Sequence, residues 1–148
     1  MKLTDKTLAL LVEGDPAEVE VLHFVRSPPI SQLGHSSLHR CRRLVSLSLA
    51  RLGLRTIDGD ALAACATLWW IDLSRNHLET LAGSGLDAFA ALGLLDVSGN
   101  ALAIDAIASI GEVEVVRLHI AGNPAAADRA AALATAPPAG DLDRRLVT

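Results

Sequence analysis

The sequence has few cysteines, few aromatic residues and no long apolar run. Two cysteines, Cys41 and Cys65, cannot form the disulfide framework that stabilises small secreted proteins, so reduced thiols are expected. No stretch approaches the roughly 18 consecutive apolar residues of a membrane-spanning helix, and the polar residues after Met1 do not resemble a secretory signal. These absences predict a cytoplasmic or nuclear protein with no membrane partner.

An excess of positive charge is also lacking. The formal net charge is −4, which excludes a general attraction to nucleic acid or anionic membranes. The sole basic cluster spans residues 39–43, and nucleic-acid binding or nuclear import is one interpretation of it. We favour a solvated edge in which Cys41 and Leu44 are anchored inside, because no aromatic residues alternate with the arginines for base stacking.

Leucine at regular spacing is what the sequence has in abundance. The segment from Leu68 to Asn100 contains the pattern L-x-x-L-x-L-x-x-N-x-L and begins it again 24 residues later. Copies start at residues 19, 44, 68, 92 and 115, so their spacings are 25, 24, 24 and 23 residues. In this pattern and spacing the chain resembles the leucine-rich repeat family.

Each position of the repeat has a physical role. Ile71 and Leu73 alternate with polar residues, so a short strand points them into a core. Asn76 follows at a turn, where its amide satisfies backbone groups that a buried, tightly turning chain leaves unpaired. The spacer then returns on the convex side and fills the core with three apolar residues. These are Leu81, Leu86 and Phe89.

The chain is expected to form one α/β domain over residues 1–148, a solenoid of about five repeats with a parallel concave sheet. Residues 1–18 form an N-terminal cap, with a helix over 4–13 that starts at Thr4 or Asp5 and stops at Gly14. Residues 19–123 carry the repeats, of which the last spacer, 101–114, is more helical. Residues 124–148 form a C-terminal cap with a short Ala-rich helix before Pro137.

The C-terminal cap strengthens the resemblance to small intracellular leucine-rich repeat proteins. Gly122, Asn123 and Pro124 are followed by a helical stretch, a proline and Leu142-Asp143, which is similar to the cap of those proteins. Similar proteins include a nuclear regulator of protein phosphatase 1, an outer-arm dynein light chain, a spliceosomal partner of small nuclear RNP and acidic nuclear phosphoproteins. The resemblance implies a binding module, and it does not select a partner because such relatives bind unrelated ones.

Strand phase predicts which side chains line the concave face. The outward positions form three rows across the five strands, with a rim of arginines beyond them. The first row is Val21, Ser46, Trp70, Leu94 and Arg117, the second is His23, Ser48, Asp72, Asp96 and His119, and the third is Val25, Ala50, Ser74, Ser98 and Ala121, with Arg26, Arg51 and Arg75 on the rim.

Trp70 is the informative residue of the first row. A tryptophan on a solvent-facing row is costly unless a partner covers it, and the sequence has only four aromatic residues. We favour a docking role over packing of Trp69 or Trp70 under a loop. The predicted protein-binding residues are Trp70, Asp72, Leu94, Asp96, Arg117, His119, Ser48 and Arg75.

Catalysis and metal binding have little support. Asp72 and Asp96 are expected to be neighbours, and such a pair could accept a proton or hold a metal, but no nucleophile and base converge with them. Four soft-ligand residues have no spacing typical of a zinc site. They are His35, His39, Cys41 and Cys65. We therefore expect no enzyme activity and no cofactor.

The predicted function is a non-catalytic protein-binding module or adaptor. It would be a monomer when free and would recognise a peptide or helix of another protein on its concave face, with an acidic centre that selects a basic segment. The alternative is a constitutive subunit of a ribonucleoprotein or of a cytoskeletal or axonemal assembly. Strong salt sensitivity through Arg40, Arg42 and Arg43 would favour the ribonucleoprotein.

Overall fold

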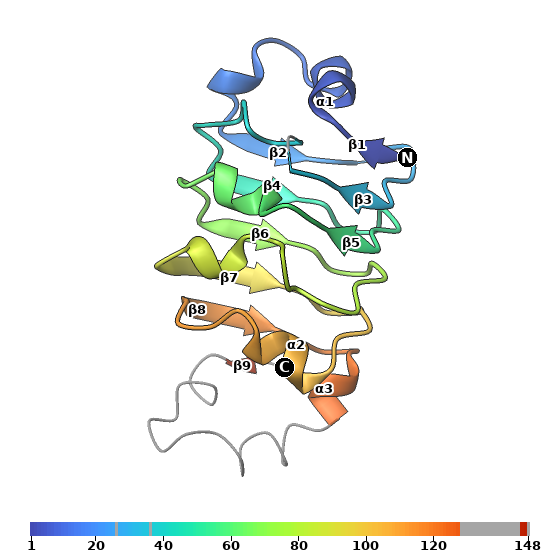
Figure 1. Cartoon of the computed structure of the whole chain (residues 1–148), viewed down its shortest axis with the longest axis vertical. Helices are drawn as coiled ribbons and strands as arrows, with labels where there is room; N and C mark the ends of the chain where they lie inside the picture. The colour runs from blue at the N-terminus through green and yellow to red at the C-terminus, as the bar shows by residue number, and fades with distance from the viewer. Residues whose placement is uncertain (26, 36, 128–145, 148) are drawn as a thin grey trace.

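A computed structural model describes residues 1–25, 27–35, 37–127 and 146–147 (Figure 1). Short strands dominate and short helices connect them. The elements in chain order are β1 Lys2–Leu3, α1 Asp5–Leu11, η1 Pro16–Glu18, β2 Val21–His23, β3 Gln32–Leu33, β4 Ser46–Ser48, β5 Thr56–Ile57, η2 Ala61–Ala64, β6 Trp70–Asp72, η3 Leu86–Ala88, β7 Ala91–Asp96, α2 Ile104–Ala108, β8 Glu114–His119, α3 Pro124–Ala127 and β9 Leu146–Val147, where η marks a 3₁₀ helix. Among the described residues, no helix has the length and apolar character needed to cross a membrane.

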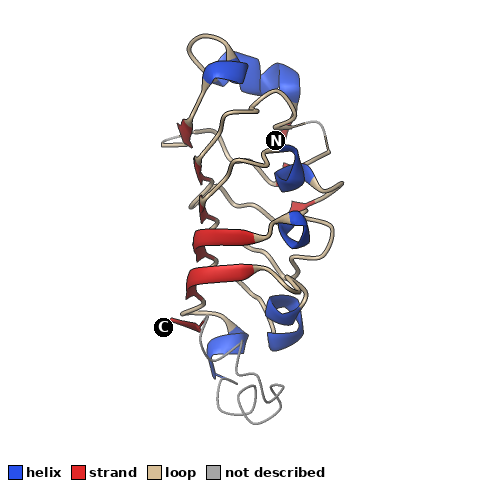
Figure 2. Ribbon diagram, turned by 90° about the vertical axis from the view of Figure 1, so that its left-hand side faces the viewer, coloured by secondary structure: helices blue, strands red, loops and turns tan. Residues whose placement is uncertain are grey.

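Six parallel strands form the larger sheet, in the order β2-β4-β6-β7-β8-β9. The five strands of the sequence repeat stand side by side in the predicted register. Trp70, for example, pairs with Ser46 on one side and Leu94 on the other. In side view, the helices η2, η3 and α2 lie on the opposite side of the molecule from this sheet (Figure 2). One face of the sheet is therefore left uncovered by helices, and we name it the open face; it corresponds to the predicted concave face.

A second parallel sheet was not predicted. It contains β1, β3 and β5, and it lies beside the larger sheet further along each repeat (Figure 1). Leu3, Leu33 and Ile57 point into the core from its three strands. Two-residue strands show no alternation in the sequence, so only the stacking of repeats produces this sheet.

The core occupies the space between the strands and the returning segments. Ile71 and Leu73 of the third repeat are fully buried, as are their counterparts Leu95 and Val97 in the fourth. The convex-side residues of the spacer are also buried, as predicted. No repeat could bury these side chains alone, because each is covered by the next copy.

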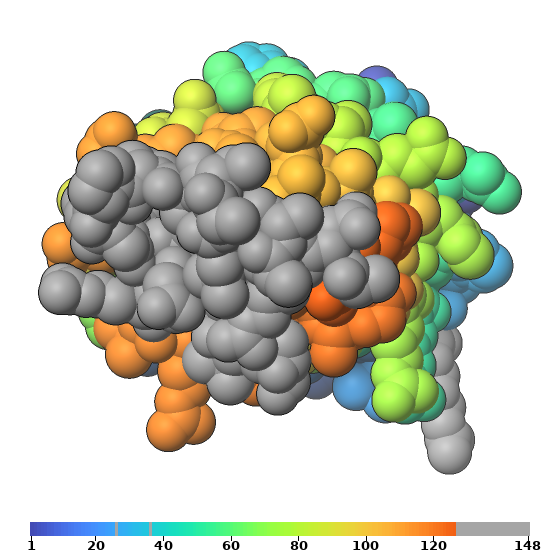
Figure 3. Space-filling view, turned by 90° about the horizontal axis from the view of Figure 1, so that it is seen from below, coloured from blue at the N-terminus to red at the C-terminus, as the bar shows by residue number. Residues whose placement is uncertain are grey.

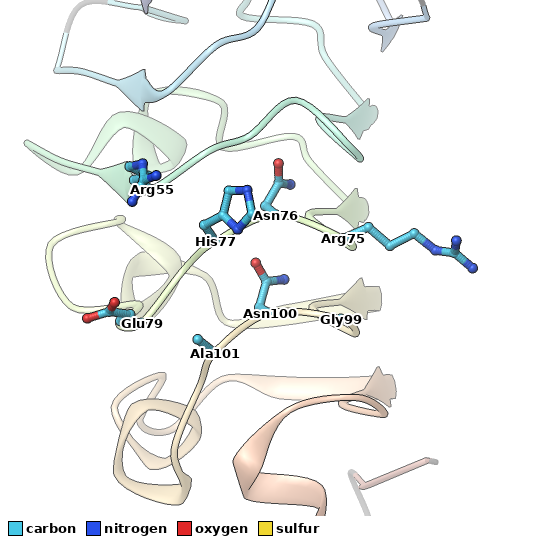
Figure 4. A pocket seen from close by; sticks show the side chains of 8 residues that line it. All are labelled: Arg55, Arg75, Asn76, His77, Glu79, Gly99, Asn100 and Ala101. Carbon is cyan, nitrogen blue, oxygen red and sulfur yellow. The ribbon is translucent and has the colours of Figure 1, made fainter.

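Asparagine side chains form a ladder along the turns, as predicted. The Asn76 carboxamide accepts hydrogen bonds from the backbone N–H of Leu52 and Leu54 at 3.0 and 2.9 Å. Its amide nitrogen donates to carbonyls of both its own repeat and the preceding one. Asn100 and Asn123 repeat the arrangement, and Figure 4 shows Asn76 and Asn100 one above the other.

Leu52 stands where an asparagine would extend this ladder, and it is buried. The preceding turn explains the exception. Pro28 and Pro29 have no N–H to donate, and the N–H of Ile30 donates to the backbone carbonyl of Leu52 at 3.0 Å. An asparagine at position 52 would find few donors there, so an apolar side chain fills the space at lower cost.

The N-terminal helix α1 is shorter than predicted. Thr4 caps it through a reciprocal pair of hydrogen bonds with Thr7, which agrees with the predicted start. The helix ends at Leu11, three residues before the predicted stop at Gly14. Of its predicted apolar stripe only Leu8 is buried, and Leu11 is 41% exposed.

The C-terminal part agrees with the sequence in the segment that is described. The spacer before β8 contains α2, as its different apolar phase predicted. Helix α3 begins at Pro124 and contacts α2, and Figure 3 shows this end of the molecule with α3 in orange-red. The remainder of the predicted Ala-rich helix, together with Pro137 and Leu142, lies outside the described residues.

Candidate functional site

The open face carries the predicted rows. Val21, Ser46, Trp70, Leu94 and Arg117 are register partners on adjacent strands, and so are His23, Ser48, Asp72, Asp96 and His119. Parallel pairing at this register places equivalent side chains on neighbouring strands roughly 4.8 Å apart. The predicted site residues of these rows therefore form one continuous surface.

Trp70 lies on the open face, and it is half-buried rather than fully exposed as predicted. The ring of His23, two strands away, lies 5.5 Å from the indole at an interplanar angle of 41°. His23 in turn shares a 3.0 Å hydrogen bond with the hydroxyl of Ser46, which stands between them. The tryptophan is thus held on the sheet by a neighbouring ring instead of extending freely into solvent.

Asp72 and Asp96 are neighbours, as predicted, and each carboxylate also closes a local turn. One oxygen of Asp72 accepts the backbone N–H of Ser74 at 2.9 Å, and Asp96 accepts that of Ser98 at the same distance. The second oxygen of Asp96 lies 3.7 Å from Nδ1 of His119. In each aspartate one oxygen therefore holds the backbone, while the second contacts a neighbouring side chain, which is the Ser48 hydroxyl at 3.5 Å for Asp72 and His119 for Asp96.

The remaining predicted residues differ in exposure. Leu94 and Ser48 are half-buried beside Trp70 and Asp72, and Arg117 is exposed at the β8 end. Ser74 of the third row is an exception, because it is buried. Its backbone is fixed between Asp72 and the Asn76 amide, which accounts for its low exposure.

Trp69 is a surface residue that the sequence reasoning did not include in the site. It immediately precedes β6, is 50% exposed, and lies against Gly93 of the next strand. A Cβ added at Gly93 would lie 2.0 Å from the indole nitrogen, so the glycine makes room for the ring. Trp69 and Gly93 occupy the same position of adjacent repeats in the sequence. The pairing of the largest side chain with the smallest residue could therefore have indicated that the indole lies over the glycine. Exposed Val45 and Val116 extend this apolar row.

The rim beyond the third row has an unusual backbone. Arg51 and Arg75 have φ angles of 60° and 55°, in the left-handed region. Gly99 and Gly122 take the equivalent turn position in the next two repeats, with φ of 66° and 73°. Arg26, predicted on the same rim, lies outside the described residues.

The basic cluster at residues 39–43 is partly neutralised. Arg43 pairs with both Glu18 and Glu20, at 2.6 and 2.9 Å, and Arg40 lies 3.9 Å from Asp15. Cys41 and Leu44 within and beside it are fully buried, as predicted. This edge presents less free positive charge than its sequence suggests.

The two cysteines are buried at equivalent positions of adjacent repeats. Burial raises the pKa of the Cys65 thiol to about 12, with a further contribution from Cys41. Burial, together with the carboxylate of Asp5, also raises the pKa of Cys41, against a lowering by Arg40. Such thiols are protonated and poor nucleophiles at neutral pH. The described part of the chain also contains no cluster of three or more His, Cys, Asp or Glu side chains that could hold a metal ion.

The comparison with protein families agrees with this geometry. A model described as leucine rich repeat matches residues 20–102, which is more than half of the chain. The chain belongs to the leucine-rich repeat family. The matched segment includes β2, β4, β6 and β7 of this leucine-rich repeat protein, and hence Trp70, Asp72, Leu94 and Asp96. A comparison with curated proteins gave no match. Domains of this family mediate protein–protein interaction, so the open face is a candidate protein-binding surface.

Proposed function

We propose that this leucine-rich repeat protein is a non-catalytic binding module that holds a segment of another protein on its open face. The observation that carries the proposal is the placement of Trp70. A half-buried indole with Leu94 beside it forms an apolar anchor, and charged side chains surround it. Interfaces combine apolar anchors and charged rims in this way, and tryptophan is among the residues that contribute most to binding energy.

The partner is expected to be a peptide or a helix with basic side chains near the anchor. Asp72 and Asp96 are half-buried on the open face, and each has one oxygen that does not hold the backbone, where an arginine or lysine of the partner can bind. Arg117 and His119 lie at the β8 side of the same surface and favour an acidic residue there. The segment would therefore run across the strands, with its basic part over β6 and β7.

The architecture we propose is five repeats over residues 19–123 between an N-terminal cap, 1–18, and a C-terminal cap, 124–148. Leu3 and Leu8 support the first cap, because both are fully buried at the start of the stack. Polar caps of this kind keep terminal repeats from associating. The free protein is accordingly expected to be a monomer.

Affinity capture from the native cell tests the proposal. Wild type is compared with Trp70→Ala, with Asp72→Asn, and with Asp87→Asn as a matched control. Asp72→Asn removes the charge while keeping an oxygen that can accept the Ser74 N–H. Asp87 is exposed on η3, on the opposite side of the molecule from the open face.

A specific partner should be retained by Asp87→Asn and weakened by both open-face variants. Loss of a tryptophan anchor costs about 2 kcal/mol or more, which corresponds to a roughly 30-fold higher Kd. Circular dichroism of each variant checks that it is folded. Equal capture by the wild type and the folded Trp70→Ala protein would show that the partner binds elsewhere.

A further inference from the structure

The rim arginines Arg51 and Arg75 occupy a turn position whose backbone favours glycine. In the left-handed region the Cβ of an ordinary residue is crowded by its own backbone, whereas glycine has no Cβ. Glycine does occupy the equivalent position in the next two repeats, at Gly99 and Gly122. The turn itself therefore gives no reason for arginine at positions 51 and 75, and their side chains need another one.

Neither guanidinium has a partner within the described chain. Arg51 and Arg75 are exposed, and no hydrogen bond or ion pair involves their side chains there. They stand in the turns that follow the adjacent strands β4 and β6, and the Arg51 N–H donates to the backbone carbonyl of Ser74 at 3.1 Å, so the two arginines are close along the backbone. Arg43, in contrast, is neutralised by two glutamates. Two unpaired arginines on adjacent turns form a strong site for carboxylates, which guanidinium groups bind through paired N–H donors.

The surroundings of the two arginines also suit a polypeptide. Beside Arg51 lies a hollow of about 290 Å³ whose apolar lining includes Phe24, Val25 and Ala50. Val25 is 78% exposed and would be covered by an apolar side chain in this hollow. On the other flank, Figure 4 shows the Arg75 side chain directed away from Arg55, His77 and Glu79, so Glu79 does not neutralise it.

We infer that this rim binds an acidic segment of the partner protein, with carboxylates on Arg51 and Arg75 and one apolar side chain in the hollow. The inference deepens the proposed function and rests on it, because the rim borders the open face. Asp72, three residues before Arg75, and its neighbour Asp96 on β7 would repel acidic residues from the centre. The partner segment is therefore amphoteric, with its acidic residues at the rim and its basic residues at the centre.

A synthetic peptide of eight glutamates around one leucine tests the rim directly. The full ¹⁵N-labelled chain is titrated with it by NMR, and Kd is compared between wild type and two double variants. Arg51→Gln/Arg75→Gln removes the rim charge and keeps the backbone strain, since glutamine also has a Cβ. Arg40→Gln/Arg42→Gln removes the same charge from the other basic region.

The rim variant should bind at least tenfold more weakly, and the control variant should stay within twofold of wild type. Amide shifts should concentrate around Val25, Arg51 and Arg75. A peptide with serine in place of leucine should bind more weakly, and one with lysines in place of glutamates should not shift the amides of the rim. A third variant, Arg51→Gly/Arg75→Gly, should lose peptide binding while its Tm rises, because glycine fits the turn; a purely structural role of the arginines would lower the Tm.

Three outcomes would overturn the inference: no binding at about 1 mM peptide, an unchanged Kd in the rim variant, or an equal loss in both double variants. The last outcome would mean attraction to net charge alone. These results are separable from the proposed function, which is tested by Trp70→Ala and the native partner. If the rim variant is unaffected while Trp70→Ala still loses that partner, the open face binds protein and only the assignment of acidic residues to the rim is wrong.

Discussion

Replacement of the ladder asparagines by leucine should destabilise the fold in a defined order. Asn76 accepts the backbone N–H of two buried residues, Leu52 and Leu54. The Asn100 side-chain oxygen accepts one, that of Leu78, at 3.0 Å. Leucine removes these acceptors and leaves the N–H groups buried without partners. Asn76→Leu should therefore cost more than Asn100→Leu.

The magnitude follows from the number of donors left unpaired. Each buried, unsatisfied N–H costs about 1–3 kcal/mol, so Asn100→Leu should lower the free energy of unfolding by about 1–3 kcal/mol. Asn76→Leu should lower it by about 2–6 kcal/mol on the same basis. Leu52 occupies the equivalent place in the preceding repeat, so a leucine side chain fits the space. The loss in free energy of unfolding is therefore attributed to the missing hydrogen bonds and not to a poor fit of the leucine side chain.

Urea unfolding followed by tryptophan fluorescence measures these differences through the shift in midpoint at constant slope. Leu52→Asn is the converse variant and should also destabilise, because the prolines of the preceding turn give its amide few donors. A gain in stability for Leu52→Asn would refute the explanation that the prolines leave an asparagine at position 52 with few donors. Wild-type midpoints for both asparagine variants would refute the ladder as a source of stability, and a larger loss for Asn100→Leu would refute the predicted order.

Two further predictions concern Trp69 and the thiols. Gly93→Ala should displace the Trp69 indole, since the new Cβ would lie 2.0 Å from the indole nitrogen. The tryptophan fluorescence emission should therefore shift to the red. A similar shift on adding Gly93→Ala to the Trp69→Ala variant would contradict the assignment to Trp69. Burial raises the pKa of the Cys65 thiol to about 12 in the folded protein, whereas the ordinary thiol pKa is 9.0. The buried thiol therefore makes its full contribution to stability below pH 9, and this contribution is lost as the pH rises toward 12. At pH 8, Cys41 and Cys65 should therefore react with a disulfide reagent much more slowly in the folded protein than in the protein unfolded in urea. Equal reaction rates in the two states would show that the thiols are accessible in the fold.

The register of the large sheet was predictable because two periods coincide in the sequence. Alternation within each strand decides which side chains face outward, and the repeat length decides which residues are neighbours across strands. These two facts place Asp72 beside Asp96 and Trp70 beside Leu94, as the structure has them. A slip of one residue would have moved Ile71 to the surface, so burial holds the register.

Other features depend on contacts that no sequence period describes. Trp70 is half-buried because the ring of His23 approaches it from two strands away, and this depends on the side-chain orientations of both residues. The strand at Lys2–Leu3 has too few residues to show alternation, and it is defined by its pairing with β3, which pairs in turn with β5. Exposure and short strands are thus consequences of assembly rather than of local pattern.

Within each repeat, the side chains that hold the fold together differ from most of those that form the open face. Inward leucines and the asparagine ladder satisfy the core and the turns, so most outward side chains are not required for folding. Asp72 and Asp96 are exceptions, because one oxygen of each also holds a turn. Removing the whole carboxylate should therefore reduce both stability and binding, whereas Asp→Asn should reduce binding alone. A comparison of alanine and asparagine at these two positions separates the structural from the recognition role on the open face.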